Sequence, residues 1–210
     1  MRAVWRHFEY NYREGGLRQV VYKIFWRLQQ WLWSESSWLI YRVDVTQYRR
    51  DPTLLLHREL LDFDQLIRHQ YFKAQLFPEA MQARLASGGI CHGFFIGDEL
   101  ANVGWTTRGY LELERDLALP EKDSIGIFDC FTLPAHRSKG IYTDTLISLL
   151  RAARDQGAVH ALIAVDPGNL ISIKGIERAG FRPLYQFKRL RRCGRETFHK
   201  SDFVLRNGQN

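Results

Sequence analysis

Cysteine is scarce in this chain and irregularly placed. Only three of the 210 residues are cysteine: Cys91, Cys130 and Cys193. An odd number at wide spacing fits neither a disulfide framework nor a zinc-binding pattern, so we expect no metal site. Because chains without disulfide candidates are typical of reducing compartments, we expect a cytoplasmic protein.

Long apolar stretches are also missing. No run of 18 apolar residues occurs, and the N-terminus has no continuous apolar core of signal-peptide length. The sequence therefore predicts neither a membrane-spanning helix nor a visible export signal. It also lacks the two common glycine-rich nucleotide motifs, the dinucleotide fingerprint with three spaced glycines and the P-loop ending in Gly-Lys-Ser/Thr.

Positive charge is in excess. Thirty Lys and Arg against 23 Asp and Glu give a formal net charge of +7. This balance favours an anionic partner such as a phosphorylated cofactor, an acidic lipid surface or nucleic acid. No recognised nucleic-acid-binding motif accompanies the charge, so we expect no nucleic-acid partner.

Tryptophan is concentrated at the N-terminus, with five of six Trp residues in the first 38 positions. Apolar residues recur with a period near 3.6 over 17–33, which predicts an amphipathic helix. We expect residues 1–36 to form a basic helical arm and residues 37–210 to form one domain. The apolar stripe of the arm has three interpretations. It covers the domain, pairs with a second subunit in a homodimer, or lies on an anionic membrane, which would make the protein peripheral on the inner face of the membrane.

The remainder of the chain alternates strand and helix patterns. The apolar patterns predict strands over 38–45, 90–96, 100–106, 125–133, 158–165, 181–190 and 197–205, and helices over 58–72, 78–86, around 146–153, and over 169–179. Gly97-Asp98 is a plausible hairpin turn, and the acidic stretch 108–124 is expected to be a connection. This order predicts an α/β fold, with a mixed central sheet of about seven strands flanked by helices.

The most informative segment is a short basic turn between the strand ending at Leu133 and the helix after it. It contains Arg137, Lys139 and Gly140. The first turn of a helix has backbone N–H groups without helical partners, and the helix dipole favours anions there. Gly140 permits close approach to the backbone. The turn therefore predicts a phosphate-binding site.

Several motifs follow one another in a familiar order. Residues 137–142 read Arg-Ser-Lys-Gly-Ile-Tyr, close to the pattern Arg/Gln-x-x-Gly-x-Gly/Ala. The second helix carries Asn169 and Ser172, and it ends at Gly180-Phe181. In its motifs, the chain from Ser124 to Leu190 resembles the GNAT acetyltransferase superfamily. Upstream, only the order of elements agrees.

The resemblance implies a GNAT fold with acetyl-CoA as acyl donor. Backbone amides of the 137–142 turn would grip its pyrophosphate, and the preceding strand would pair with its amide-bearing arm. The Thr132 or Leu133 N–H would stabilise the thioester oxyanion. The cofactor-binding residues expected from this resemblance are Phe131, Thr132, Leu133, Arg137, Ser138, Lys139, Gly140, Ile141, Tyr142, Thr143, Asn169 and Ser172.

The implied reaction is direct acetyl transfer to a primary amine of a small-molecule or amino-sugar acceptor. Such amines are mostly protonated at neutral pH, so a base is needed. Asp129, in an otherwise apolar strand, is the candidate base, since burial would strengthen it; the alternative is a structural aspartate. Many members carry a tyrosine acid seven residues after the Asn, but that position here is Ile176. Tyr142, Tyr185 or water would then protonate the leaving thiolate.

A second function stays open. The chain would be an acyl-CoA-binding or membrane-associated module that has kept the cofactor site and lost turnover. The isoleucine at position 176 and the Trp-rich arm favour this alternative.

Overall fold

The structure is a computed structural model that describes residues 33–68, 78–114 and 116–202. These residues form two compact units. The larger unit runs from Trp38 to Gln186, and the smaller one combines residues 33–37 with Phe187–Ser201.

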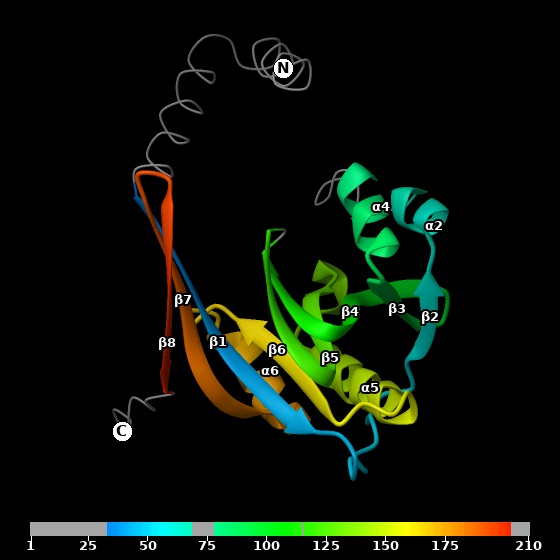
Figure 1. Cartoon of the computed structure of the whole chain (residues 1–210). Coiled ribbons are helices and arrows are strands. Elements are labelled where there is room, and N and C mark those ends of the chain that lie inside the picture. Colours follow the sequence, from blue (N-terminus) through cyan, green and yellow to red (C-terminus); the bar gives the residue numbers. More distant parts are fainter. Residues whose placement is uncertain (1–32, 69–77, 115, 203–210) are drawn as a thin grey trace. The chain divides into compact units, whose positions relative to one another are not determined.

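The strands form one mixed sheet (Figure 1). Within the described residues it has eight strands in the order β2-β3-β4-β5-β6-β1-β7-β8. Strands β5 and β6 pair in parallel, while β1–β6, β2–β3, β3–β4 and β4–β5 pair antiparallel. The α/β prediction is confirmed, with one strand more than expected. The bounds are β1 Trp33–Asp44, β2 His57–Leu61, β3 Ile90–Ile96, β4 Glu99–Glu114, β5 Leu117–Thr132, β6 His160–Val165, β7 Arg182–Arg192 and β8 Arg195–Asp202.

The helices of the larger unit are α2 (Phe63–Arg68), α4 (Pro78–Ala86), α5 (Ile141–Asp155) and α6 (Leu170–Ala179), with a 3-10 turn over Pro134–His136. Helix α6 ends where Gly180 takes φ = 106°, the left-handed cap that the Gly-Phe pair predicts. No helix among the described residues is long and apolar enough to cross a membrane.

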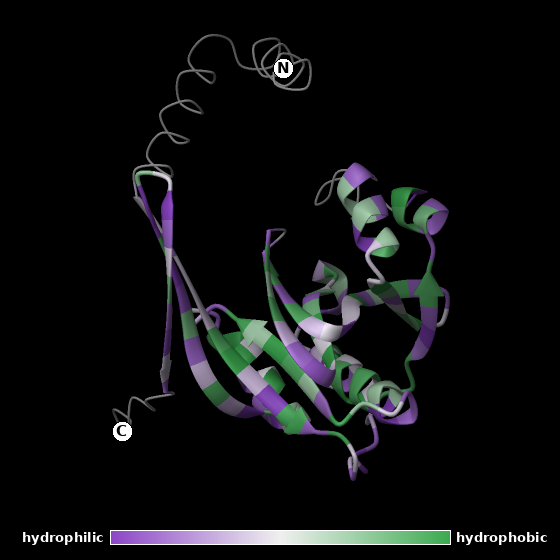
Figure 2. Ribbon diagram, in the orientation of Figure 1, coloured by the Kyte–Doolittle hydropathy of each residue, from purple (hydrophilic) through white to green (hydrophobic). Residues whose placement is uncertain are grey.

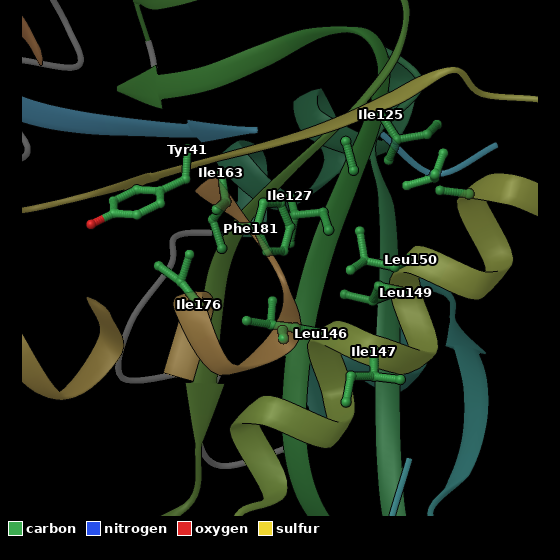
Figure 3. Packing of buried hydrophobic residues seen from close by; sticks show 14 of the residues in the cluster. Tyr41, Ile125, Ile127, Leu146, Ile147, Leu149, Leu150, Ile163, Ile176 and Phe181 are labelled. Atoms are coloured by element: carbon green, nitrogen blue, oxygen red, sulfur yellow. The ribbon is translucent and has the colours of Figure 1, made fainter. Parts of the chain in front are cut away.

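The first hydrophobic cluster packs α5 and α6 against one face of the sheet. Leu146, Leu149 and Leu150 of α5 lie toward Ile125 and Ile127 of β5 (Figure 3). Leucines at this spacing share one helix face, which explains why the period in the sequence identified α5 correctly. Strand β6 is mostly hydrophobic along its length (Figure 2), as expected for a strand between two others.

A second cluster includes side chains from α2 and α4. Leu66 and Met81 from these helices pack with Trp105 of β4 and Phe128 of β5. The Trp105 and Phe128 rings stack with centroids 6.4 Å apart. Because Ile127 and Phe128 are consecutive in a strand, their side chains point to opposite faces of the sheet.

The predicted helix over 58–72 is wrong at its start. Residues His57–Leu61 form β2, which pairs with β3. Helix α2 begins after a capping box in which the Asp62 N–H donates to Gln65 Oε1 at 2.9 Å and the Gln65 N–H donates to Asp62 Oδ1 at 2.8 Å. Residues 69–72 lie outside the described part of the chain.

The predicted connection over 108–124 is also wrong. Strand β4 continues to Glu114 and β5 begins at Leu117, so this stretch is a long hairpin. Leu111 pairs with Leu119 inside it. Four of the five acidic residues lie on these strands, and Asp116 lies in the turn between them. At the end of β4, apolar and charged residues alternate with a period of two.

Two further predictions fall at the ends of the described chain. The helix predicted over 17–33 lies outside the described residues except for Trp33, which begins β1. The last predicted strand is described as far as Asp202, where β8 ends.

The smaller unit is held by ion pairs and ring contacts. Every residue of β8 is exposed. Glu196 accepts hydrogen bonds from Arg189 and Arg191, each at 2.6 Å. Lys188 lies 3.4 Å from Glu35, and the Phe187 ring stacks on Phe198.

Because of His92 on β3, we expect the free energy of unfolding to depend on pH. Its Nε2 lies 2.8 Å from Thr106 Oγ1, and its Nδ1 accepts a hydrogen bond from Arg58, which can only donate. Burial, together with the Arg58 charge, lowers the pKa of His92 to about 3. Between pH 6.5 and 3, His92 is therefore protonated in the unfolded chain and neutral in the folded chain. The free energy of unfolding falls as the pH falls through this range.

From pH 7 to pH 5 we expect His92 to remove about 2 kcal/mol from the free energy of unfolding. Urea unfolding at these two pH values measures the loss. His92→Gln should flatten the dependence by that amount, because glutamine has no group that titrates in this range. An equally steep dependence in the variant would contradict the assignment.

Candidate active site

Strands β5 and β6 stop pairing partway along their length. Their parallel register ends with Ile127 opposite Ile163. Beyond this point, Phe128 and Asp129 of β5 and residues 164–166 line a pocket of about 600 Å³, which we call the acidic pocket.

A β-bulge marks the same point on β5. The register with β4 shifts so that one residue, Gly104, stands opposite two, Asp129 and Cys130. Asp129 has φ = 45°, a left-handed conformation that glycine takes readily and aspartate tolerates. Strained backbone of this kind clusters at functional sites.

The bulge turns Asp129 out of the core. In a regular strand its side chain would share the face of Ile127 beneath α5, but Cys130 packs against that cluster instead. Gly104 makes room, since a Cβ there would lie 3.1 Å from the Cys130 sulfur. The Asp129 side chain is 55% exposed. The expectation that Asp129 is buried is therefore wrong, and its role as base stays a prediction that burial does not support.

Arg84 of α4 joins Asp129 to the β4–β5 hairpin. Its Nη1 lies 2.7 Å from Asp129 Oδ2, and its Nη2 donates to Glu112 Oε1 at 2.6 Å. The guanidinium lies over the rings of Trp105 and Phe128, at 5.4 and 5.1 Å from their centroids. The sequence did not indicate Arg84, because no local pattern predicts that it contacts Glu112 and Asp129, which come much later in the chain.

The acidic pocket carries an excess of negative charge. One guanidinium and five carboxylates line it, from Arg84, Glu112, Glu114, Asp116, Asp129 and Asp166; the rest of the lining is apolar. A cleft of one sign concentrates ligands of the opposite sign, so this pocket favours a cation.

A second pocket, of about 640 Å³, surrounds the turn before α5. We call it the amide pocket. The N-cap of α5, Gly140, has φ = 80°, and no side chain caps the helix. The first-turn N–H groups of Ile141, Tyr142 and Thr143 lack helical partners, and these residues line the pocket. A helix start of this kind binds phosphate oxygens.

The space in front of Gly140 is open. A Cβ built on Gly140 would meet no atom within 4 Å. Ser138, two residues earlier, is also left-handed at φ = 62°. The turn therefore presents bare backbone to the pocket, as close contact with a diphosphate requires.

The side chains of the basic turn are placed differently from one another. Arg137 lines the amide pocket, with Nε donating to the Thr132 carbonyl at 3.2 Å and the guanidinium over the Phe131 ring. The Lys139 side chain does not line it, because its Nζ donates to the Ala135 carbonyl at 3.0 Å. Contact between the Lys139 ammonium and the cofactor is therefore not supported by the geometry.

Two other cations line the amide pocket from α6: Lys174 and Arg178. Sequence reasoning missed both. Their spacing of four residues on a predicted helix, which puts them on one face, was the available signal.

The two candidates for the oxyanion donor separate clearly. The Leu133 N–H donates to the Ala101 carbonyl at 3.0 Å, and Leu133 lies outside the pocket lining. This bond rules out Leu133 as the oxyanion donor. In an antiparallel ladder hydrogen-bonded pairs alternate, so the Thr132 N–H points away from β4. Thr132 also lines the pocket and stays the candidate.

Tyr142 fills the motif position where Gly or Ala is common, and α6 accommodates it. A Cβ on Gly175 would lie 2.6 Å from the Tyr142 ring, so the absence of a side chain at position 175 leaves the space that this ring occupies. Burial, with the nearby Cys130 thiol, raises the pKa of Tyr142 well above its usual value, and a hydrogen bond with Ser172 opposes the rise. The phenol therefore keeps its proton at neutral pH.

Asn169 has a structural role as the N-cap of α6. Its Oδ1 accepts from the Ser172 N–H at 3.1 Å and caps α6. Both residues line the amide pocket, so contact with a cofactor stays a prediction. Ile176 is fully buried among the side chains of the first cluster (Figure 3), and it lines neither pocket. Tyr185 lines neither pocket.

Comparison with known families decides what this arrangement is. A model of the acetyltransferase (GNAT) family matches residues 21–181. The chain belongs to the acetyltransferase (GNAT) family. A search of curated proteins found no match.

Two solved structures with TM-scores of 0.50 and 0.54 agree in fold, and a third is similar over a smaller part of this chain. A Colwellia psychrerythraea GNAT acetyltransferase is 17% identical with a TM-score of 0.50, over 75% of this chain and 55% of its own. The glucosamine N-acetyltransferase region of a fungal multi-domain β-N-acetylglucosaminidase is 11% identical with a TM-score of 0.54, over 84% of this chain and 23% of its own. A Bacillus subtilis acetyltransferase in complex with CoA is 19% identical with a TM-score of 0.44, over 60% of this chain and 76% of its own.

The GNAT family uses acetyl-CoA as acyl donor, and the amide pocket fits it. Uncapped amides at the start of α5 and the open space at Gly140 suit the diphosphate. Cys130, Phe131 and Thr132 of β5, which line the same pocket, lie where the strand no longer pairs with β6. They suit the amide-bearing arm, because a strand edge offers unpaired backbone groups.

Proposed function

We propose that this GNAT protein catalyses acetyl-CoA-dependent N-acetylation of a primary amine on a small-molecule or amino-sugar acceptor by direct attack. One observation carries the proposal. Asp129 and Cys130 are consecutive residues at the bulge, yet Asp129 lines the acidic pocket and Cys130 lines the amide pocket. Two ligands held in these pockets would meet at this bulge, and proximity of that kind supplies much of a transfer enzyme's rate.

The acidic pocket supports an amine acceptor. An ammonium group would enter a cleft lined by five carboxylates and exchange solvation for ion pairs. It must lose a proton before it can attack, and Asp129 is the carboxylate nearest the amide pocket along β5. Arg84 fixes the orientation of that carboxylate. Half-exposed, Asp129 can pass the proton on to water.

Direct attack is favoured over an acetylated enzyme. Cys130 is the nucleophilic side chain of the amide pocket, but burial, and then the Asp129 charge, raises the pKa of its thiol to about 12. A thiol that keeps its proton is a poor nucleophile. When bound, acetyl-CoA supplies the activated thioester. The Tyr142 hydroxyl lines the same pocket and stays the candidate general acid, although its raised pKa makes it a weaker acid than an exposed tyrosine.

A second candidate function is acyl-CoA binding without turnover. Its support is Ile176, which fills the core where many family members carry a tyrosine acid. The two functions differ in a measurable way, since only the first releases CoA in proportion to acetylated amine.

Asp129→Asn is the test. The variant keeps the shape and the left-handed tolerance of the residue but cannot take up the proton. We expect transfer to a panel of primary amines to slow by about 100-fold, within the usual range for loss of a general base, with acetyl-CoA affinity little changed. Asp166→Asn is the matched control, because it removes one charge from the same pocket and keeps an oxygen for the Gly168 N–H.

Comparing the two variants distinguishes loss of a general base from loss of one negative charge in the pocket. If both variants slow equally, Asp129 contributes only to the field of the pocket. A full-rate Asp129→Asn variant would remove this residue from the mechanism. Absence of transfer by the wild-type chain to every amine, with acetyl-CoA still bound, would favour the binding module.

A further inference from the structure

The amide pocket has a cationic wall on α6, in addition to the backbone amides at the start of α5. The start of α5 offers its uncapped amides on one side. Lys174 and Arg178 line the pocket from α6. Among the described residues neither side chain forms an ion pair, and both are exposed.

This pair is unfavourable for α6 by itself. Cations four residues apart on a helix repel each other by a few tenths of a kcal/mol. The turn residue Lys139, by contrast, is tied to the Ala135 carbonyl outside the pocket. The charge available to an anion in this pocket therefore comes in large part from α6.

An apolar side chain adjoins the two cations. Ile171 lines the same pocket one turn before Lys174, and it is 86% exposed. Residues 171, 174 and 178 share one face of α6, since they are separated by three and four positions. The face therefore joins one apolar contact to two adjacent cations.

We infer that this face of α6 binds the adenosine 3′-phosphate of the donor. CoA carries three phosphates, two in its diphosphate and one on the ribose beside the adenine. Lys174 and Arg178 bind the ribose phosphate through charge-assisted hydrogen bonds, and Ile171 packs against the adenine. The inference rests on the donor of the proposed function and is independent of the acceptor.

Calorimetry with CoA and 3′-dephospho-CoA at one ionic strength tests it. The full-length wild-type chain should bind CoA at least tenfold more tightly than 3′-dephospho-CoA. The Lys174→Gln/Arg178→Gln variant should bind both ligands with the affinity that the wild type shows for 3′-dephospho-CoA. Lys139→Gln is the control, because it also removes a cation near the motif and should keep the wild-type ratio.

Each other outcome overturns the inference in a recognisable way. Equal affinities of the wild type for the two ligands would refute the 3′-phosphate site, but they would not contradict CoA binding or the proposed acetyl transfer. Parallel loss of both ligands in the double variant would assign the cations to the diphosphate. Binding of neither ligand by the wild type would refute the donor itself, together with this site.

Discussion

Gly140→Asp should weaken acetyl-CoA binding by more than about 100-fold while the chain remains folded. The new carboxylate would project into the open space before the α5 amides, where a Cβ meets no atom within 4 Å. A carboxylate beside a phosphate costs several kcal/mol through like-charge repulsion. The left-handed φ of 80° should reduce stability by about 1 kcal/mol, too little to unfold a domain of ordinary stability. Calorimetric titration with acetyl-CoA and thermal melting measure the two effects.

Gly140→Asn is the matched control. Asparagine has the same size, also tolerates the left-handed region and differs in charge. It should lose roughly the same stability, and its affinity should fall by no more than about tenfold. Equal affinities for the aspartate and asparagine variants would mean that no phosphate lies near Gly140.

Arg84→Met should lower the free energy of unfolding by about 3 kcal/mol, because it leaves a nearly buried carboxylate without its ion-pair partner. Glu112 is 14% exposed and loses the two Arg84 N–H groups that donate to its Oε1, while methionine keeps the packing against Trp105. Asp129 loses its clamp in the same variant. The apparent KM for the amine acceptor should therefore rise while acetyl-CoA affinity stays unchanged. Urea unfolding and steady-state kinetics measure the two effects.

The double variant Arg84→Met/Glu112→Gln separates charge from packing. Neutralising the stranded carboxylate should return part of the lost stability, which a cycle of the single and double variants quantifies. It should not restore the acceptor KM, since Asp129 still lacks its partner. Additive losses of stability in the two single variants would show that Arg84 and Glu112 are not coupled.

Local patterns predicted most of the regular elements. Helix α5 follows from its leucine spacing, and the hairpin at Gly97-Asp98 follows from its turn residues. Strand β2 could not be predicted, because its five residues have one buried side chain and owe their conformation to pairing with β3. The start of α2 was readable in the Asp62-x-x-Gln65 capping box.

The candidate site shows the same division. The turn over 137–142 was identified as an anion site because its chemistry lies in consecutive backbone groups. Asp129 was noticed as a polar residue in an apolar strand, but its exposure depends on a bulge opposite Gly104. The Tyr142 ring of α5 fits only because Gly175 of α6 has no side chain. The two residues lie on different helices, so no local pattern in the sequence relates them.

By itself the sequence determined the order of the main elements, the helix start that faces the donor and the family. Each of these depends on neighbours along the chain, through hydrophobic period, turn residues and unpaired amides. Only the tertiary structure decided where charge acts, turning Lys139 away, bringing Lys174 and Arg178 in, and setting Arg84 between two carboxylates. Side-chain electrostatics depend on distances through space, which residues far apart in the chain acquire only when the sheet and its helices pack.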